Sequence, residues 1–278
     1  MRNRFSQKRL SQLSLQMRKT MIQMGYDCGT SAHFGGGLSM VESLAVLYDC
    51  ILKYDVKNKQ LADRDRFILS KGHGVLGFYA ALYTFGLIGK NQIKSFQQNE
   101  SEFIAHPIMD LDYGIESSNG SLGHGLSLGI GIALAARLKK KHYRTFVMLG
   151  DGECNEGSVW EAVMCAAHFK LNNLVAIVDR NKMQNDGISK DVMEFHSIER
   201  SWKSFGWDVI SINGHDLKAL HDSLKPEKSL TKPRVIIANT IKGRGVSFME
   251  GVPSWHHGKL TEQTYQQAIK ELNSESKI

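Results

Sequence analysis

The segment Thr145-Phe-Val-Met-Leu-Gly-Asp-Gly-Glu153 determines the expected fold, because an apolar run leads directly into a glycine-rich polar turn. The apolar part has the composition of a buried strand, and a second such run occupies 174–178. Asp151 follows the first run and Asn181 follows the second. In an open parallel sheet, ligands gather beyond the carboxyl ends of the strands. We therefore expect these two side chains to converge at one edge of a sheet.

Strand-like and helical segments alternate along the rest of the chain. Strand-like runs recur at 66–69, 207–211 and 234–238, and helical stretches lie between them. Small residues are frequent in 123–141, which predicts a buried helix. The order predicts an α/β fold, a doubly wound parallel sheet with helices on both faces, in a single domain over residues 1–278.

The first residues are rich in Lys and Arg and poor in acidic residues, a composition that organelle transit peptides share. Their apolar residues, however, recur every three or four positions, as in an amphipathic helix. This stripe consists of Leu10, Leu13, Met17, Met21 and Met24. We expect a helix over about residues 6–25 that docks on the domain.

Composition excludes several classes of protein. The net charge of +7 comes from scattered Lys and Arg without a recognised nucleic-acid module, so no nucleic-acid partner is expected. The 4 cysteines form no Cys-x-x-Cys pair and are typical of reduced thiols, which favours the cytoplasm. No apolar run reaches the length that a membrane helix requires, so no membrane partner is expected.

The polar residues after the two central strands fit a magnesium–diphosphate site. Magnesium prefers oxygen ligands in octahedral geometry and keeps substrate phosphate oxygens among them. Asp151, Asn181 and the Met183 carbonyl oxygen supply one carboxylate, one amide and one carbonyl ligand. Gly150 and Gly152 allow close backbone approach to a diphosphate. A Gly-Asp-Gly turn alone more often joins a strand to a helix without binding anything.

Histidine-containing segments extend this interpretation. Gly150-Asp-Gly152 followed by Asn181 resembles the cofactor motif of thiamine diphosphate enzymes, and the histidines narrow the resemblance to the amino-terminal part of transketolase. The segments that carry the narrower resemblance are Ser31–Ser39 with His33, Asp65–His73, Phe103–Pro107 with His106, Gly120–Gly125, and Trp255–Gly258 with His256 and His257. They cover nearly the whole chain.

The resemblance implies a role for each histidine. It implies that His73 and His257 hold the cofactor diphosphate, whereas His33 and His106 face sugar hydroxyls and assist proton transfers. Histidine suits both tasks because its neutral ring donates one hydrogen bond and accepts another, and its pKa lies near neutrality. His256 competes with His257, which we prefer because it precedes the glycine. A single histidine of this kind is more often a structural or surface residue.

The resemblance also implies thiamine diphosphate and Mg²⁺ as cofactors, with Ca²⁺ or Mn²⁺ as substitutes for Mg²⁺. The cofactor-binding residues that it implies are His73, Gly120, Ser121, Leu122, Gly150, Asp151, Gly152, Glu153, Asn181 and His257.

The implied reaction transfers a two-carbon ketol unit from a ketose or ketose phosphate to an aldose. Full-length relatives continue into a second domain, which binds the aminopyrimidine ring and carries the glutamate that activates it, and then into a third. The resemblance therefore implies the amino-terminal subunit of a split transketolase. Its expected partner is a separate carboxy-terminal subunit, in an α2β2 heterotetramer that is active only when complete.

Two alternatives stay open at this point. The chain could be the α subunit of a 2-oxo-acid dehydrogenase or decarboxylase, which shares the cofactor site, or a non-catalytic partner that retains the fold. Phe34, Ser121 and Ile108 also depart from the usual residues of full-length transketolases. The last two border the substrate side and favour a specialised sugar, such as a branched or nucleotide-linked one, over pentose phosphates.

Overall fold

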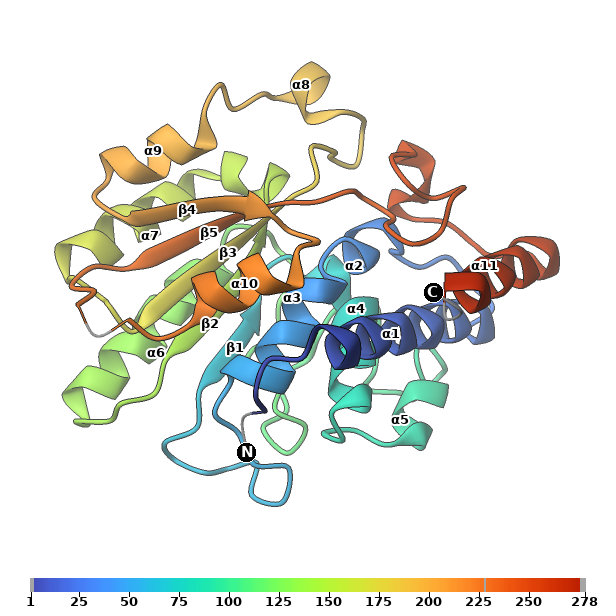
Figure 1. The fold of residues 1–278 in the computed structure, drawn as a ribbon, viewed down its shortest axis with the longest axis horizontal. Helices are drawn as coiled ribbons and strands as arrows, with labels where there is room; N and C mark the ends of the chain where they lie inside the picture. Colours follow the sequence, from blue (N-terminus) through green and yellow to red (C-terminus); the bar gives the residue numbers. More distant parts are fainter. Residues whose placement is uncertain (1–2, 228, 276–278) are drawn as a thin grey trace.

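The computed structural model describes residues 3–227 and 229–275. Its centre is a parallel sheet of 5 strands in the order β1–β2–β3–β5–β4 (Figure 1). The strands are β1 (Arg66–Leu69), β2 (Thr145–Gly150), β3 (Leu174–Arg180), β4 (Asp208–Asn213) and β5 (Arg234–Asn239). The predicted parallel α/β sheet is confirmed.

Successive side chains of each strand enter two different apolar cores, one on each face of the sheet. In β2, Phe146 and Met148 belong to one core, and Val147 and Leu149 belong to the other. The first core is covered by α1 (Gln7–Asp27), α3 (Val41–Val46), α4 (Val75–Thr84), α10 (Leu217–Leu224) and α11 (Glu262–Glu275). The second is covered by α6 (Gly125–Leu138), α7 (Gly157–His168) and α9 (Ile198–Ser204) (Figure 1). Burial on both faces explains why the central strands β2, β3 and β5 are mainly apolar, whereas the edge strand β4 carries polar residues and is only partly buried.

Shorter helices lie in the connections. They are α2 (Gly35–Leu38), α5 (Lys90–Lys94), α8 (Ser189–Val192), a π-helical turn at Leu47–Ile51, and 3-10 turns at Gly72–Gly74, Gly152–Asn155 and Pro253–His256. Among the described residues, no helix combines the length and the apolar character needed to cross a bilayer.

The amino-terminal helix α1 matches the predicted docking helix within two residues at each end. Ser6 caps it by accepting a hydrogen bond from the backbone nitrogen of Arg9 at 3.4 Å. Met17 and Met21 are fully buried, whereas Leu13 is only partly buried. The periodic stripe therefore packs on α3 and α4, in the first core.

The helix expected over 123–141 is shorter, because α6 begins at Gly125 and ends at Leu138. It is buried on one face only, since Leu128 and Leu138 are exposed. Gly123 adopts a left-handed backbone conformation with φ of +83°, which cannot continue a helix. A Cβ at this position would lie 2.8 Å from the Cβ of Glu156. The glycine therefore allows a close approach between two loops before the helix starts.

Strand β4 also starts one residue later than expected, at Asp208. The Trp207 indole is buried and packs edge-on against Trp202, with ring centroids 4.7 Å apart. Its Nε1 donates to the Val163 carbonyl oxygen at 2.9 Å. Trp207 thus belongs to the helix–sheet core.

Strand register brings the predicted ligands to one edge. Gly150 pairs with Asp179, and Arg180 pairs with Asn239, so β2, β3 and β5 end close together. The residues that follow these ends, including Asp151 and Asn181, therefore share the carboxyl edge of the sheet.

Candidate cofactor and substrate site

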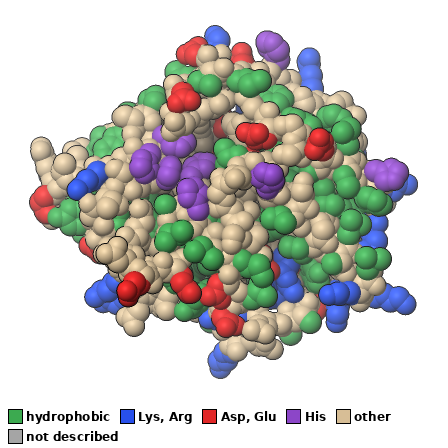
Figure 2. Space-filling model, turned by 180° about the vertical axis from the view of Figure 1, so that it is seen from behind, with side chains coloured by type: hydrophobic (Ala, Val, Ile, Leu, Met, Phe, Trp, Pro, Cys, Tyr) green, Lys and Arg blue, Asp and Glu red, His purple; other side chains and the backbone are tan. Residues whose placement is uncertain are grey.

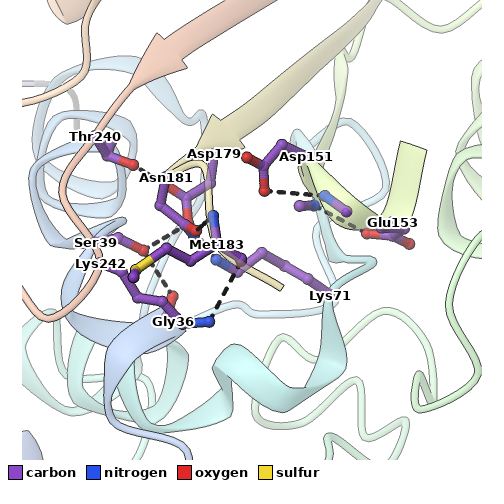
Figure 3. Close-up of polar contacts among 12 residues, drawn as sticks. Gly36, Ser39, Lys71, Asp151, Glu153, Asp179, Asn181, Met183, Thr240 and Lys242 are labelled. Atoms are coloured by element: carbon purple, nitrogen blue, oxygen red, sulfur yellow. Dashed lines mark hydrogen bonds and ion pairs between the residues drawn. The ribbon is translucent and has the colours of Figure 1, made fainter. Parts of the chain in front are cut away.

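A buried ion pair forms the floor of the site (Figure 3). Lys71 and Asp179 are joined by an ion pair, and the side chain of each is 1% exposed. Asp179 also accepts hydrogen bonds from Ser39 and Thr240, each at 2.5 Å. Burial opposes ionisation of Asp179, but the Lys71 charge and these hydrogen bonds together hold the pKa of its carboxyl below the usual value.

This ion pair also orients Asn181. The amide nitrogen of Asn181 donates to Asp179 at 3.2 Å, which leaves its oxygen to point elsewhere. That oxygen accepts from the backbone nitrogen of Met183 at 3.1 Å. Since an amide oxygen has two lone pairs, it keeps the capacity for a further partner, such as a metal ion.

Asp151 lies at the end of β2 with both carboxylate oxygens on backbone donors. Gly152 donates to Oδ1 at 2.9 Å, and Lys182 donates to Oδ2 at 2.7 Å. Burial, and then the charge of Asp179, raises the pKa of Asp151 to about 6. A cation at this point would offset the cost of ionising it. Hard-oxygen ligands of this kind fit Mg²⁺.

A metal ion at this site would need ligands other than His, Cys, Asp and Glu side chains. Within residues 3–227 and 229–275, no three His, Cys, Asp or Glu side chains gather in a group that could hold a metal ion. A metal site at this edge would therefore need other oxygen ligands besides Asp151, and the Asn181 amide and the Met183 carbonyl stay the predicted ones.

Lys242 places a second buried ammonium group at the site. Its Nζ contacts Met183 O at 3.3 Å, Gln184 O at 3.1 Å and His256 Nδ1 at 2.7 Å. Burial, and then the charge of Lys71, lowers the pKa of Lys242 to about 8. No carboxylate in the described part of the chain forms an ion pair with it, although the residue is 2% exposed. A buried cation that touches only neutral acceptors favours an anionic ligand.

The Glu153 carboxylate joins three segments of the chain by hydrogen bonds. Its Oε1 accepts from Ser70 and from the Gly123 nitrogen at 2.9 Å, and its Oε2 accepts from the Gly150 nitrogen at 3.0 Å. The residue is 2% exposed. Because protein donors occupy both oxygens, the contacts favour a positioning role for Glu153. Its direct contact with the cofactor stays a prediction.

These residues line an open cavity of about 550 Å³. Most of the residues that the sequence predicts for the site are on its wall: His33, His73, Gly120, Leu122, Gly150, Asp151, Gly152, Glu153, Asn181 and Met183. Lys71, Lys242 and His256 join them. Ser121, His106 and His257 are not among the lining residues.

His33 is the centre of a histidine cluster that opens to the surface (Figure 2). Its ring centroid lies 4.4 Å from that of His257, 5.5 Å from His256, 5.6 Å from His73 and 5.9 Å from His106. Burial, and then the neighbouring imidazoles, lowers the pKa of His33 to about 3. The cluster therefore includes the three histidines expected near a substrate or cofactor and both members of the 256–257 pair.

The two adjacent histidines occupy different positions. The His256 ring stacks on His73 with centroids 5.2 Å apart, and its Nδ1 contacts Lys242. Burial lowers the pKa of His256 to about 4, so its ring is neutral near pH 7. His257 is exposed and lies against His33. The preference for His257 on the diphosphate side stays a prediction, but the contacts favour His256 for that place.

Sequence reasoning missed Lys71, Asp179 and Lys242 as site residues. Each had a weak signal. Asp179 is an acidic residue inside an apolar strand, and Lys71 and Lys242 follow shortly after the ends of β1 and β5. Charged residues at such places are costly to bury unless they are paired or bind a ligand.

A parallel α/β sheet with hard-oxygen ligands, a buried cation and a histidine cluster at its carboxyl edge is typical of a protein that binds a metal and a phosphorylated cofactor. Residues 21–277 match the family model described as "Transketolase, thiamine diphosphate binding domain". The chain belongs to the transketolase family.

Individual relatives agree with this assignment. The chain is 39% identical to an apulose-4-phosphate transketolase subunit of Phocaeicola vulgatus, with 92% of this chain and 91% of the relative covered. It is 39% identical to the 6-deoxy-6-sulfo-D-fructose transketolase subunit SqwG of Clostridium sp., with 87% and 89% covered. It is thus similar in length to both relatives and corresponds to an amino-terminal transketolase subunit.

The transketolase structure from Campylobacter jejuni superimposes with a TM-score of 0.85 at 28% identity. The match covers 94% of this chain but 43% of that protein, so this chain spans less than half of a full-length transketolase. These relatives favour transketolase over the α subunit of a 2-oxo-acid dehydrogenase.

Proposed function

We propose that the chain is the diphosphate-binding subunit of a split transketolase, and that the complete enzyme transfers a two-carbon ketol unit from a ketose or ketose phosphate to an aldose. Its partner is a separate carboxy-terminal subunit, and the assembly is an α2β2 heterotetramer in the cytoplasm. The relatives of similar length that are named as transketolase subunits support the need for a second chain.

The observation that carries this proposal is that one cavity wall contains a buried carboxylate, Asp151, and a buried ammonium without an ion-pair partner among the described residues, Lys242. Asp151 gains from a cation, and Lys242 gains from an anion. Magnesium bound to a diphosphate meets both demands. Asp151, Asn181 and the Met183 carbonyl would hold Mg²⁺, with Ca²⁺ or Mn²⁺ as substitutes.

The diphosphate would lie between the β2 turn and the histidines. Lys242, His73 and His256 offer donors there, and His257 remains the alternative to His256. When bound, thiamine diphosphate supplies the nucleophilic carbon and the electron sink for breaking and forming the carbon–carbon bond. The protein groups described here supply binding and orientation of that cofactor.

His33 and His106 are the candidates for contact with the sugar. Burial lowers the pKa of both rings, so both are neutral near pH 7. A neutral imidazole donates to one hydroxyl and accepts from another, which allows it to orient a polyol. His33 lies between the cavity and the open side of the cluster, where it can hold a hydroxyl in place or pass on its proton.

Ile108 and Ser121 are exposed, and each departs from the residue that is usual in full-length transketolases. We therefore expect the donor or acceptor to be a sugar other than the common pentose phosphates. The names of two relatives mention different sugars, apulose 4-phosphate and 6-deoxy-6-sulfo-D-fructose.

Reconstitution tests the proposal. The chain and a carboxy-terminal transketolase subunit are mixed with Mg²⁺, thiamine diphosphate and a panel of ketose donors and aldose acceptors. Mass spectrometry should detect an aldose product lengthened by two carbons without release of carbon dioxide. Magnesium-dependent cofactor binding without product from any pair would favour a non-catalytic partner. Release of carbon dioxide from a 2-oxo acid would contradict the reaction.

A further inference from the structure

The segment 241–244, which carries Lys242 past the end of β5, is held at both ends by side chains from outside the site. The Ile241 nitrogen donates to His215 Nε2 at 2.9 Å. The Arg18 Nε donates to the carbonyl oxygen of Arg244 at 2.9 Å. Lys242 lies between these two anchors, so they constrain where its ammonium can reach.

Glu42 connects the two anchors. Its Oε1 accepts from Arg18 Nη2 at 2.6 Å, and its Oε2 lies 3.0 Å from His215 Nδ1. The exposed fractions of the side chains are 6% for Arg18 and 10% for Glu42, and 13% for His215. One carboxylate on α3 thus joins α1 to the turn after β4, with little access for water.

The hydrogen bonds determine the proton positions on His215. Since the Ile241 N–H donates to Nε2, that nitrogen is unprotonated, and the ring proton is on Nδ1. Nδ1 therefore donates to Glu42. Arg18 supplies the positive charge that Glu42 requires, and the three side chains form a buried network whose donors and acceptors match.

A glycine permits the close approach of Arg18 to the segment. Gly245 has φ of +96°, and a Cβ on it would lie 2.6 Å from both Cδ and Nε of Arg18. The backbone also contacts the glycine-rich helix α2, because the Gly243 nitrogen donates to Gly35 O at 3.1 Å. The segment is therefore fixed on several sides.

We infer that Arg18, Glu42 and His215 are positioning residues that hold 241–244 so that the Lys242 ammonium reaches Met183 O and His256 at the cavity wall. They act on the ligand only through Lys242. The consequence for cofactor affinity rests on the proposed function, whereas the anchoring itself does not.

Hydrogen exchange of the cofactor-free full chain tests the anchoring. In His215→Ala, the Ile241 amide should exchange at least about tenfold faster than in the unsubstituted chain, because it loses its acceptor. It is followed in a peptide that begins at least two residues before Ile241 and spans the segment. His221→Ala is the matched control, since this histidine lies nearby on α10 and contacts Phe5 and Asp222 instead. Equal protection of the segment in His215→Ala and the unsubstituted chain would overturn the inference.

A double-mutant cycle tests the route through Lys242. Binding of thiamine diphosphate at fixed Mg²⁺ is measured by calorimetry for His215→Ala, Lys242→Met and the double variant. His215→Ala should weaken binding about tenfold when Lys242 is present and leave it nearly unchanged in Lys242→Met. Losses that simply add would contradict a role through Lys242. If the unsubstituted chain binds no cofactor, the proposed function fails, while hydrogen exchange still decides the anchoring.

Discussion

Lys71 and Asp179 form a buried ion pair that joins the turn after β1 to β3, and Asp179 accepts a hydrogen bond from the predicted metal ligand Asn181 at 3.2 Å. Each charge compensates the other, so the pair contributes little net charge to the cavity above it. Lys242 is thus the buried ammonium that remains to attract an anion. The arrangement separates a structural lysine from a ligand-directed one within a single site (Figure 3).

Asp179→Asn should reduce the free energy of unfolding by about 3–5 kcal/mol, because it leaves the Lys71 charge buried without a counterion. Lys71→Met should have a similar effect for the opposite reason. The double variant should be less destabilised than the sum of the two, because no buried charge is left unpaired. Urea unfolding of the four proteins measures this.

The exposed pair Lys53–Asp63 is the matched control for this cycle, with side chains 47% and 35% exposed. Lys53→Met should change the free energy of unfolding by less than about 1 kcal/mol. If Lys71→Met and Lys53→Met lowered the free energy of unfolding by similar amounts, the Lys71–Asp179 pair would stabilise the fold no more than an exposed pair does.

The metal-free chain should lose stability as the pH rises through about 6 because of Asp151. The pKa of this carboxyl in the folded chain is about 6, above its usual value of 3.8, so the folded state favours the protonated form. The contribution is therefore present below pH 3.8 and is lost as pH rises towards and through 6. Asp151→Asn should abolish this part of the pH dependence.

Chemical denaturation from pH 4 to pH 8, compared between the two proteins, checks this sign. A stability difference that does not vary with pH would contradict it.

Asp151→Ala should also abolish magnesium-dependent cofactor binding without unfolding the chain, and Asn181→Ala should weaken binding less, because an amide attracts a cation less strongly than a carboxylate.

Lys242→Met should weaken binding of thiamine diphosphate about tenfold to a hundredfold, because a hydrogen bond to a charged group contributes about 1.5–3 kcal/mol. In the unsubstituted chain, affinity should fall as the pH rises above about 8, where the free ammonium loses its proton. Calorimetric titrations at pH 7 and pH 9 measure both effects. Equal pH dependence in the two proteins would exclude Lys242 as the titrating group.

His33→Ala and His106→Ala should each lower ketol transfer far more than cofactor affinity, because both histidines are expected to contact the sugar. His256→Ala should do the reverse if it faces the diphosphate. Steady-state kinetics of the reconstituted enzyme, together with calorimetry, separates the two patterns. A defect confined to cofactor binding in His33→Ala would refute its assignment to the substrate.

The sequence was sufficient for the sheet because its central strands are apolar runs that are buried on both faces, and the polar turns after β2 and β3 identified its carboxyl edge. The sequence was less informative where a single residue determined the first residue of a helix or strand. Trp207 is a residue type that is common in strands, yet it precedes β4 and its ring packs against Trp202 in the helix–sheet core. Gly123 continues a run of small residues, but its backbone conformation delays the helix.

The sequence predicted those site residues that belong to recognisable local motifs. Asp151, Asn181 and the histidine loops stand out because polar residues interrupt apolar or glycine-rich segments. Lys242 does not, because its significance depends on its position in three dimensions, where it contacts neutral acceptors and has no ion-pair partner among residues 3–227 and 229–275. Likewise, the sequence favoured His257 by its neighbour glycine, whereas ring packing decides which of the two histidines lies on the cavity wall.

We expect this chain to anchor the cofactor but not to activate it without its partner. The most direct measurement is the exchange rate of the C2 proton of bound thiamine diphosphate, followed by NMR in deuterated buffer. With the chain alone and saturating Mg²⁺, we expect binding and an exchange rate close to that of the free cofactor. Addition of the carboxy-terminal subunit should accelerate exchange by orders of magnitude. Fast exchange with the isolated chain would contradict the split-enzyme account.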